Sequence, residues 1–523
     1  MPKKIILCFD GTCNDPADAV QGNGLFGLGG PEDNGITNVL KLHLMLGGDL
    51  KKKPQVGEQI NFYYPGVGTY GNWFQKLRNT AFSPEQEDVS TIIKNAFKDL
   101  YTSYESDDEL FIFGFSRGAA IARRFASVLP DIFEALDNTR VPRVRFLGVF
   151  DTVAAINKPN LREEKKPASD VVFENRTISA CIDEALHILA LDEKRIPFYP
   201  TLMNQEDRVT EIWFPGAHAD VGGGYRYDGL SDGALQFMLD ELQRRKLGLR
   251  ITPPTGINYS ELSDDDEVDI DFQDVIVQPN YLGKSHQQEA ITKIKKSFLN
   301  DRQMRINVND FHSTNPPTVH HTVIDRIHDK EEYRPNSLSI QKVTHPYTGK
   351  IVPHQVWYSP TQSKEFNSLS EHKSGGREAL IRLEPGEKHE FSVYANQKFN
   401  PSGVLVNEGE QYTFSTDMNQ NWFDANIECG PDGWDRSDID AWFGKEWFIK
   451  NKENERRCPS AKWFEVVCAI NKSEDSIFKI LDLIQRGNAY TVPVKGELFS
   501  FANDLDSMYG NNLGAITITV SRQ

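Results

Sequence analysis

The stretch DELFIFGFSRGAAIARRFA, residues 108–126, indicates the fold of the N-terminal part of the chain. Its large apolar residues predict a buried strand, and the alanine-rich run after Gly-Phe-Ser-Arg-Gly predicts a helix. A turn between such a strand and helix exposes its serine on a cramped backbone, where Gly114 and Gly118 leave room for the helix. This context favours a nucleophilic role for Ser116 over the alternative, a polar residue in an ordinary glycine turn.

Strand and helix signals alternate over the first 330 residues, which predicts a parallel sheet with helices on both faces. Short apolar runs indicate the strands, and apolar residues spaced three and four apart indicate the helices. The expected strands are 3–11, 59–66, 109–116, 144–155 and 209–225. The expected helices are 34–46, 88–104, 119–129 and 230–246.

The pattern changes near residue 385 to short alternating strands separated by turn residues, which is typical of an all-β sandwich. We therefore expect a catalytic domain over residues 1–330, a connecting or accessory segment over 331–385, and a β-sandwich domain over 386–523. A chain of 523 residues is also too long for one typical core.

Composition excludes several classes of protein. The net charge of −17 argues against a nucleic-acid binder, and attraction to an anionic membrane would have to be local. The short apolar run at the start is flanked too poorly for a signal peptide, and no run of about 18 apolar residues exists. We expect a protein made in the cytoplasm without a signal peptide, which another machine exports if it acts outside.

A serine nucleophile needs a base, and the base needs a carboxylate to orient it. Asp151 follows the strand after the serine turn, and His218 follows the last expected strand of the sheet. Because carboxyl ends of parallel strands meet at one edge, Ser116, Asp151 and His218 are the predicted triad. The alternative, in the chain order more usual for such hydrolases, is Asp220 with His320.

Two backbone segments are candidates for stabilising an oxyanion. The N–H of Arg117 lies at the N-terminus of the helix that follows Ser116. The first strand ends at the same edge of the sheet, so the N–H of Gly11 or Thr12 is the predicted second donor. The neighbouring Asp10 has an alternative role in holding its own loop.

These motifs together resemble the bacterial type VI secretion lipase effectors, an α/β-hydrolase family. The matching stretches, over about residues 3–330, are FDGTCN, FGFSRGAAIARR, GVFDTVA, ALDEKRIPF and WFPGAHADVGGGY. In this resemblance Ser116 corresponds to the nucleophile, Asp151 to the Asp of Asp-Thr-Val, and His218 to the His of His-x-Asp-Val-Gly-Gly-Gly.

The resemblance implies a phospholipase A type enzyme that cleaves acyl esters of membrane phospholipids. It implies an antibacterial toxin delivered by a type VI system into the periplasm of a target cell. An immunity protein and a component of the secretion apparatus are the partners expected with it. The glycine-rich residues 15–35 are a candidate lid.

The C-terminal domain resembles the calcium-dependent, galactose-binding bacterial lectins of the PA-I type, over about residues 387–523. The specific part of the resemblance is Asn-Asp-x(4)-Tyr-Gly-Asn-Asn in GELFSFANDLDSMYGNNLGAITITV. It implies calcium ligands at Asp504, Asn511 and Asn512 with the Met508 carbonyl, a set of oxygen ligands that suits calcium. The alternative is a structural turn, because Asn and Asp are common turn formers.

A carbonyl near Asp424 or Ala425 is the less certain fifth calcium ligand. The lectins contact sugar through a His-Pro-x-Gln stretch that has no obvious counterpart here, so a preference for galactose does not follow. The leading hypothesis is an esterase with a calcium-dependent domain that docks on glycans or membrane. The alternatives are a carbohydrate-binding module on an inactive hydrolase scaffold, and an esterase for soluble or glycan esters.

Overall fold

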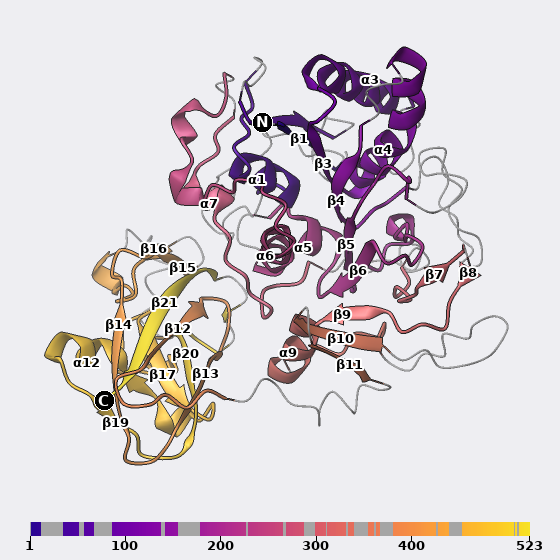
Figure 1. The fold of residues 1–523 in the computed structure, drawn as a ribbon. Coiled ribbons are helices and arrows are strands. Elements are labelled where there is room, and N and C mark those ends of the chain that lie inside the picture. The colour runs from indigo at the N-terminus through magenta and orange to yellow at the C-terminus, as the bar shows by residue number, and fades with distance from the viewer. Residues whose placement is uncertain are drawn as a thin grey trace. The chain divides into compact units, whose positions relative to one another are not determined.

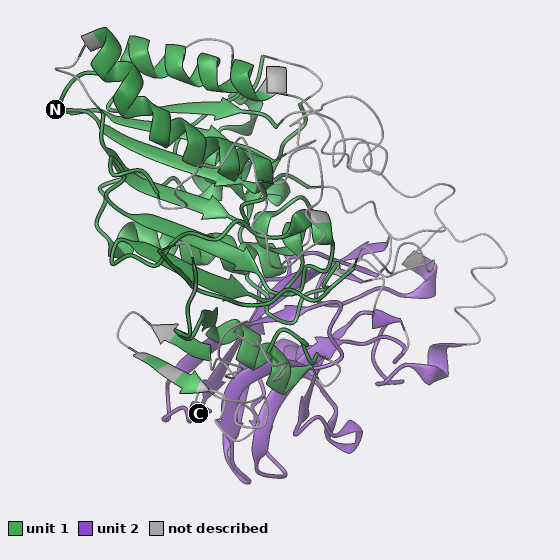
Figure 2. Ribbon diagram, turned by 90° about the vertical axis from the view of Figure 1, so that its right-hand side faces the viewer, with its two compact units in different colours: residues 1–20, 34–375 green, residues 21–33, 376–523 purple. Residues whose placement is uncertain are grey.

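The chain forms two compact units, residues 1–20 with 34–375 and residues 21–33 with 376–523 (Figure 2). This computed structural model describes residues 2–11, 35–51, 57–66, 86–137, 142–154, 178–225, 229–264, 268–286, 299–309, 311–330, 333–338, 354–359, 362–366, 380–424, 427–438, 452–506, 508–509 and 512–523.

A nine-stranded sheet forms the centre of the first unit, in the order β11-β10-β9-β6-β5-β4-β3-β1-β2 (Figure 1). All neighbours pair in parallel except β10 and β11, which are antiparallel. The strands are β1 (Lys4–Phe9), β2 (Gln59–Tyr64), β3 (Glu109–Phe115), β4 (Val144–Phe150), β5 (Ala185–Ala190), β6 (Val209–Phe214), β9 (Thr318–His320), β10 (His354–Ser359) and β11 (Gln362–Phe366). A separate hairpin joins β7 (Asn307–Val308) and β8 (Phe311–His312).

Helices cover both faces of this sheet (Figure 1). Strand β1 shows why, because Ile5, Leu7 and Phe9 pack with α3 and α4 in one core while Ile6 and Cys8 pack with α1 and α6 in another. A strand buried on both faces needs a continuous apolar run. The helices of the unit are α1 (Asn38–Met45), α3 (Gln86–Ser103), α4 (Ser116–Asp137), α5 (His218–Gly222), α6 (Gly229–Arg244), α7 (Phe272–Val275) and α9 (His321–Asp329).

The sheet contains a strand that the sequence analysis missed. Strand β5 is completely buried and lies between β4 and β6, so the strand before His218 is not the direct neighbour of the strand before Asp151. A buried His187 interrupts the apolar run of β5. Its Nε2 accepts the N–H of Thr152 at 3.1 Å, and its Nδ1 lies 2.7 Å from Oε1 of Glu211.

Strands β10 and β11 fall in the segment 331–385, for which we predicted a connecting or accessory role. They extend the sheet of the first unit beyond β9, with Gln355 to Trp357 of β10 paired to Thr318 to His320 of β9. Among the described helices, none combines the length and apolar composition needed to cross a membrane.

The second unit is an antiparallel β domain. One sheet has the order β16-β15-β21-β14-β19, with β12 also paired to β21, and the other has the order β13-β20-β17-β18. Both sheets contribute side chains to one core, as in a sandwich. Its elements are β12 (Lys388–Tyr394), β13 (Asn400–Val406), β14 (Gln411–Thr416), β15 (Trp422–Asp424), β16 (Ile427–Cys429), β17 (Val466–Ile470), β18 (Phe478–Lys479), α12 (Ile480–Arg486), β19 (Tyr490–Thr491), β20 (Gly496–Ala502) and β21 (Leu513–Arg522).

Candidate active site

Ser116 lies in the tight turn between β3 and α4. Strand β3 ends at Phe115 and the helix begins at Ser116, whose φ of 57° is in the left-handed region. Residues other than glycine rarely adopt this conformation, and it recurs at functional turns. A Cβ on Gly114 would lie 2.7 Å from Cα of Ala119, so a larger residue before the turn would collide with the helix.

The first turn of α4 also packs against the end of β1. A Cβ on Gly118 would lie 2.3 Å from the carbonyl oxygens of both Phe9 and Asp10, and these are backbone atoms that cannot rotate away. The helix therefore approaches β1 as closely as a glycine permits. This contact fixes Ser116 relative to the carboxyl edge of the sheet.

The structure brings Ser116, His218 and Asp151 together at that edge. Ser116 Oγ lies 2.8 Å from His218 Nε2, and His218 Nδ1 lies 2.6 Å from Asp151 Oδ2. Asp151 follows β4, and His218 begins α5 after β6. With the Nδ1 proton donated to the carboxylate, Nε2 is left to accept the serine proton. The arrangement can activate a serine hydroxyl for attack on a carbonyl.

Asp151 is held by a buried arginine that sequence analysis did not single out. Arg302 Nη1 donates to Asp151 Oδ1 at 2.6 Å, and Nη2 donates to Oδ2 at 2.9 Å. The N–H of Ala190 donates to Oδ1 at 3.1 Å. Burial by itself would raise the pKa of Asp151, but the Arg302 guanidinium and the hydrogen bond from His218 lower this pKa well below its ordinary value.

Arg302 also joins the ends of neighbouring elements. It donates to the carbonyl of Ala190 at 2.7 Å and to the carbonyl of Phe198 in the 3₁₀ helix η3 (Ile196–Phe198). Its surrounding sequence, NDRQMR, has neither strand nor helix periodicity, so no local pattern marks it. Only the fold places this cation beside the acid.

His218 is buried between two aromatic rings. The ring of Phe115 lies 4.6 Å from the imidazole centroid, and the ring of Phe198 meets it edge-on at 5.0 Å. Burial lowers the pKa of His218 below its ordinary value, although Asp151 opposes this shift. A lowered pKa keeps the imidazole neutral near neutral pH, as a general base requires.

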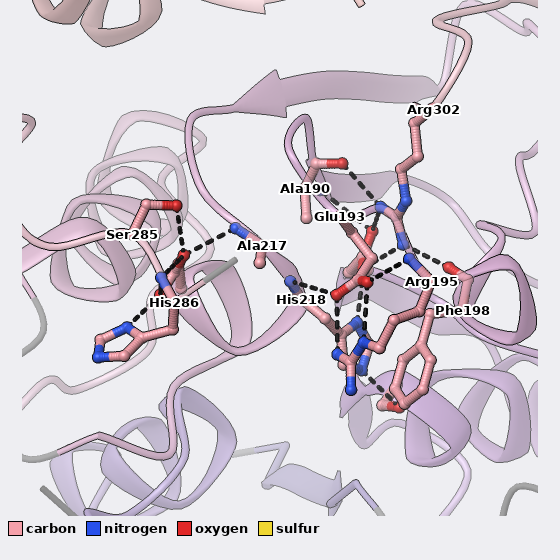
Figure 3. A network of polar contacts seen from close by, with 12 residues as sticks. Ala190, Glu193, Arg195, Phe198, Ala217, His218, Ser285, His286 and Arg302 are labelled. Atoms are coloured by element: carbon pink, nitrogen blue, oxygen red, sulfur yellow. Dashed lines mark hydrogen bonds and ion pairs between the residues drawn. The ribbon is translucent and has the colours of Figure 1, made fainter. Parts of the chain in front are cut away.

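Glu193 and Arg195, from the quoted stretch ALDEKRIPF, lie next to His218 (Figure 3). Glu193 Oε2 accepts the backbone N–H of His218 at 3.2 Å. Although burial alone would raise the pKa of Glu193, the Arg195 guanidinium lowers it to about 2. Glu193 is therefore ionised and orients the start of α5.

The alternative pair, Asp220 with His320, is not assembled with Ser116. Asp220 Oδ2 accepts the N–H of Ala217 at 2.8 Å, and Asp220 Oδ1 lies 2.6 Å from His286 Nδ1. Asp220 thus stabilises the glycine-rich turn through the backbone of Ala217.

His320 is enclosed on the sheet rather than at the serine turn. Its ring stacks on Phe214 with centroids 4.2 Å apart and on Trp357 at 5.2 Å, and its Nδ1 lies 2.9 Å from Oγ1 of Thr322. Burial lowers the pKa of His320 well below its ordinary value. As the N-cap of α9, it has a structural function.

The predicted oxyanion donors have different surroundings. Arg117 is the second residue of α4, in the turn whose N–H groups point toward the helix N-terminus. The N–H of Gly11 donates to Asp10 Oδ1 at 2.6 Å, so it is already engaged. Asp10 Oδ2 accepts the hydroxyl of Tyr63 at 2.6 Å, which ties β1 to β2. Thr12 and residues 15–34 of the candidate lid lie outside the described residues.

In the second unit, Asp504 and Asn512 of the predicted calcium site are neighbours. Asn512 Nδ2 donates to Asp504 Oδ2 at 2.9 Å, and both residues are buried. Burial raises the pKa of Asp504. Oδ1 of Asn512 is buried and has no hydrogen-bond partner among the described residues. An unpaired buried oxygen beside a buried carboxylate fits a site for a hard cation.

The other predicted calcium ligands are less informative. Met508 is described, and its side chain is exposed. Asp424 accepts the indole N–H of Trp434 through Oδ2 at 3.1 Å. Asn511 and Ala425 lie outside the described residues. Within the described ranges, no group of three or more His, Cys, Asp and Glu side chains could hold a metal ion.

Comparison with known proteins links the first unit to a family. Residues 3–133 and 131–241 match the family described as T6SS, Phospholipase effector Tle1-like, catalytic domain. The matched residues include Ser116, Asp151 and His218. This part of the chain, which is less than half of its length, is therefore similar to the catalytic domain of that family.

The matches to individual proteins cover only part of the chain and have low sequence identity. An uncharacterised protein of Saccharomyces cerevisiae is 33% identical over 137 residues, which are 24% of this chain and 17% of that protein. The structure of the Tle1 effector bound to the VgrG spike of the type VI secretion system is 24% identical, with a TM-score of 0.28, over 43% of this chain and 52% of that one. The PllA-like lectin that forms the N-terminal domain of EclA is 17% identical, with a TM-score of 0.18, over 28% of this chain and 100% of that one. The chain therefore spans about a sixth of the curated relative and about half of the effector structure.

Proposed function

We propose that the first unit is a serine ester hydrolase of the phospholipase A type, acting on acyl esters of membrane phospholipids. The observation that carries the proposal is the pair of contacts from His218, to Ser116 at 2.8 Å and to Asp151 at 2.6 Å. The match of residues 3–241 to a phospholipase effector domain supports the same substrate class.

In the acylation step, Ser116 Oγ attacks the ester carbonyl carbon while its proton passes to His218 Nε2. Asp151, kept ionised by Arg302, stabilises the imidazolium through Nδ1. The tetrahedral intermediate carries its charge on the former carbonyl oxygen, toward which the Arg117 N–H is the proposed donor. Collapse breaks the bond to the glycerol oxygen, which takes the proton from His218 and leaves as a lysophospholipid.

In the deacylation step, water attacks the acyl carbon of the acyl-enzyme and gives a proton to His218 Nε2. The second tetrahedral intermediate breaks its bond to Ser116 Oγ, which recovers that proton. The products are a free fatty acid and the regenerated serine. This sequence needs only the three residues, the oxyanion donors and one water molecule.

We further propose that the protein is an antibacterial effector that a type VI system delivers to the periplasm of a target cell. The family match supports this role. An immunity protein in the producing cell and a component of the secretion apparatus are its proposed partners. The Tle1 effector in the related structure is bound to the VgrG spike, which is the kind of partner we propose here.

The second unit is proposed to bind calcium and to dock on target glycans or membrane. Asp504, Asn511 and Asn512 with the Met508 carbonyl would hold the ion, with a carbonyl near Asp424 or Ala425 as a further ligand. The unpaired Oδ1 of Asn512 supports this proposal. A bound calcium ion would supply open coordination positions for sugar hydroxyls.

Fatty-acid release from mixed phospholipid vesicles, measured by mass spectrometry with and without calcium, tests these proposals. We expect release by the wild type and none by Ser116→Ala. Ser127→Ala is the matched control, because Ser127 lies on the same helix and donates only to the carbonyl of Arg124. The chain released at each position of a mixed-acyl lipid reports which ester is cleaved.

Other outcomes favour the alternatives. Absence of release by the wild type, with glycan binding retained, would point to a carbohydrate-binding module on an inactive scaffold. Equal rates on monomeric and vesicular esters would point to an esterase for soluble or glycan esters. Calcium dependence of vesicle hydrolysis, without calcium dependence on a monomeric ester, is expected if the second unit docks the enzyme.

A further inference from the structure

A second ion pair stands beside the imidazole of the proposed base. Arg195 Nε donates to Glu193 Oε1 at 2.8 Å, and Arg195 Nη2 donates to Glu193 Oε2 at 2.8 Å. The same Oε2 accepts the backbone N–H of His218 at 3.2 Å. Figure 3 shows both side chains next to His218. The position of the Arg195 cation is therefore fixed relative to the reacting residues.

The Phe198 ring contacts both this cation and the imidazole. The guanidinium carbon of Arg195 lies 3.6 Å from the centroid of the Phe198 ring, a cation–π contact. The same ring meets His218 edge-on, with centroids 5.0 Å apart. Phe198 thus holds the guanidinium close to His218 without a hydrogen bond between them. The cation is near the ester to be cleaved but takes no part in the proposed proton transfers.

Glu193 occupies only one edge of this guanidinium. The donors Nε and Nη2 are used, whereas Nη1 has no partner among the described residues. The side chain of Arg195 is 22% exposed, against 2% for Glu193 and 1% for Arg302. Arg302 is buried and binds Asp151 with both terminal nitrogens. Of these two arginines, Arg195 is the one that can still bind a ligand.

The charges around the site are balanced, unlike those of the whole chain. Asp151 is paired with Arg302 and Glu193 with Arg195, while the chain carries a net charge of −17. The two carboxylates nearest to these guanidinium groups are therefore each neutralised by a cation. A guanidinium has five donors in a planar fork, so it can bind a carboxylate on one edge and phosphate oxygens on another.

We propose that Arg195 binds the phosphate diester of the lipid substrate through Nη1 and so selects esters that carry a phosphate close to the scissile bond. The inference rests on the proposed ester hydrolase function. It supplies the local attraction that the acidic chain as a whole lacks. Arg195 is then a specificity residue, whereas Ser116, His218 and Asp151 act on any ester.

The first test compares two soluble substrates with the full-length chain. They are a short-chain phosphatidylglycerol and the diacylglycerol with the same acyl chains, both below their aggregation limits. The ratio of kcat/KM for the two is measured in the wild type, Arg195→Gln and Arg195→Lys. Arg145→Gln is the matched control, because Arg145 is an exposed arginine at the start of β4 that pairs with Glu109 and Asp183.

We expect the ratio to favour the phospholipid in the wild type and to fall about 10- to 100-fold in Arg195→Gln, as for loss of a hydrogen bond between charged groups. Arg195→Lys should keep part of the preference, and Arg145→Gln all of it. An unchanged ratio in Arg195→Gln would overturn the proposal. So would an equal loss on both substrates, because Arg195 would then act only through His218.

A binding test separates failure of this inference from failure of the proposed reaction. A short-chain diether phosphatidylglycerol has no ester to cleave, and its binding to Ser116→Ala is measured by calorimetry. We expect about 10-fold weaker binding when Arg195→Gln is added. Equal binding overturns the inference whether or not the enzyme hydrolyses phospholipid. Tighter binding of inorganic phosphate than of the diether would also overturn it, because the site would then recognise free phosphate.

Discussion

Among single residues, Arg302 has the largest influence on the acid of the proposed triad, because its guanidinium binds the Asp151 carboxylate directly. Arg302 contributes two hydrogen bonds to the carboxylate and two to backbone carbonyls. The guanidinium fixes the plane of the carboxylate and keeps it ionised. It also places a cation near His218, which disfavours protonation of the imidazole. Through Asp151, Arg302 therefore orients a base that it does not touch, whereas burial is the main cause of the lowered pKa of His218.

Replacing Arg302 tests this arrangement. We expect Arg302→Gln to lower kcat/KM by about 100-fold or more, because a buried acid without its partner both loses its orientation and destabilises the fold by about 3–5 kcal/mol. Arg302→Lys should recover part of the activity. Because a cation is removed, the pKa of His218 should rise and the acidic limb of the pH profile should move to higher pH. Initial rates on a monomeric ester between pH 4 and 8 measure both effects.

A loss of activity in Arg302→Gln without any shift of the pH profile would contradict the electrostatic part of this account. Thermal unfolding of the same variants separates a folded but slow enzyme from an unfolded one. If Arg302→Lys restores stability without moving the acidic limb back, orientation alone would explain the arginine.

The pH dependence of the wild type follows from His218 itself. Burial lowers the pKa of His218. A base acts only when neutral, so protonation should inhibit the enzyme only below the ordinary histidine range near pH 6.5. We expect kcat/KM to stay constant from neutral pH into mildly acidic solution and to fall at lower pH. A midpoint at or above pH 6.5 in the pH profile would contradict the shift.

At the scale of elements, the contact between α4 and β1 positions the nucleophile. We expect Gly118→Ala to destabilise the first unit by about 1–3 kcal/mol, because the new Cβ would meet two backbone carbonyls at 2.3 Å. It should also displace Ser116 and reduce hydrolysis. Gly233→Ala in α6 is the control, because its new Cβ would meet nothing within 4 Å. This substitution should stabilise the first unit by about 0.5–1 kcal/mol, since alanine favours a helix more than glycine does. Urea unfolding measures both changes.

If Gly118→Ala were as stable and active as the wild type, the close approach of α4 to β1 would not be needed to position Ser116. Equal effects of the two substitutions would show that helix propensity, rather than the contact with Phe9 and Asp10, determines the outcome. The pair of variants therefore distinguishes the local property of glycine from its place in the fold.

Periodicity predicted the elements that carry strong patterns. The runs before Asp10 and Ser116 and around Asp151 were expected as buried strands, and the helices after Ser116 and near Asp232 were expected from their spacing. Strand β5 was missed because its six residues include His187, a polar residue that is tolerated only where Thr152 and Glu211 satisfy its ring nitrogens. Such compensation depends on the fold and leaves no local pattern.

Some residues of the candidate site could be predicted from the sequence, and others could not. Residues at strand ends, such as Asp151 and His218, can be placed from topology alone, because parallel strands end at one edge. The roles of Arg302 and of the Arg195 Nη1 could not be predicted from the sequence, because both depend on which loops meet in space. Sequence also left Asp220 and His320 open as an alternative, which only their contacts with other residues argue against.

At the scale of the whole molecule, each unit has its own core, so each should unfold in its own transition. Calcium should raise the midpoint temperature of unfolding of the second unit and leave that of the first unit unchanged. Without a cation, burial raises the pKa of Asp504, so its charge at neutral pH costs folding free energy that calcium would offset. A calcium concentration about 100 times Kd would add about 2.7 kcal/mol to the free energy of unfolding of the second unit.

Scanning calorimetry with and without calcium measures this shift in the wild type, Asp504→Asn and Asp506→Asn. Asp504→Asn should abolish the shift. Asp506→Asn should keep it, because the Asp506 side chain is 70% exposed and pairs with Lys398. A shift that survives Asp504→Asn would place the ion elsewhere, and no shift in the wild type would favour a structural turn at this loop.

The counter-ion of Asp151 comes from a position 151 residues further along the chain. The ribosome therefore releases Ser116, Asp151 and His218 long before it releases Arg302. A nascent or truncated chain that ends between His218 and Arg302 has all three triad residues but lacks the cation that pairs with the Asp151 carboxylate. For the phospholipase proposed above, we expect this order of synthesis to delay hydrolysis until most of the first unit exists, and so to protect the membranes of the producing cell.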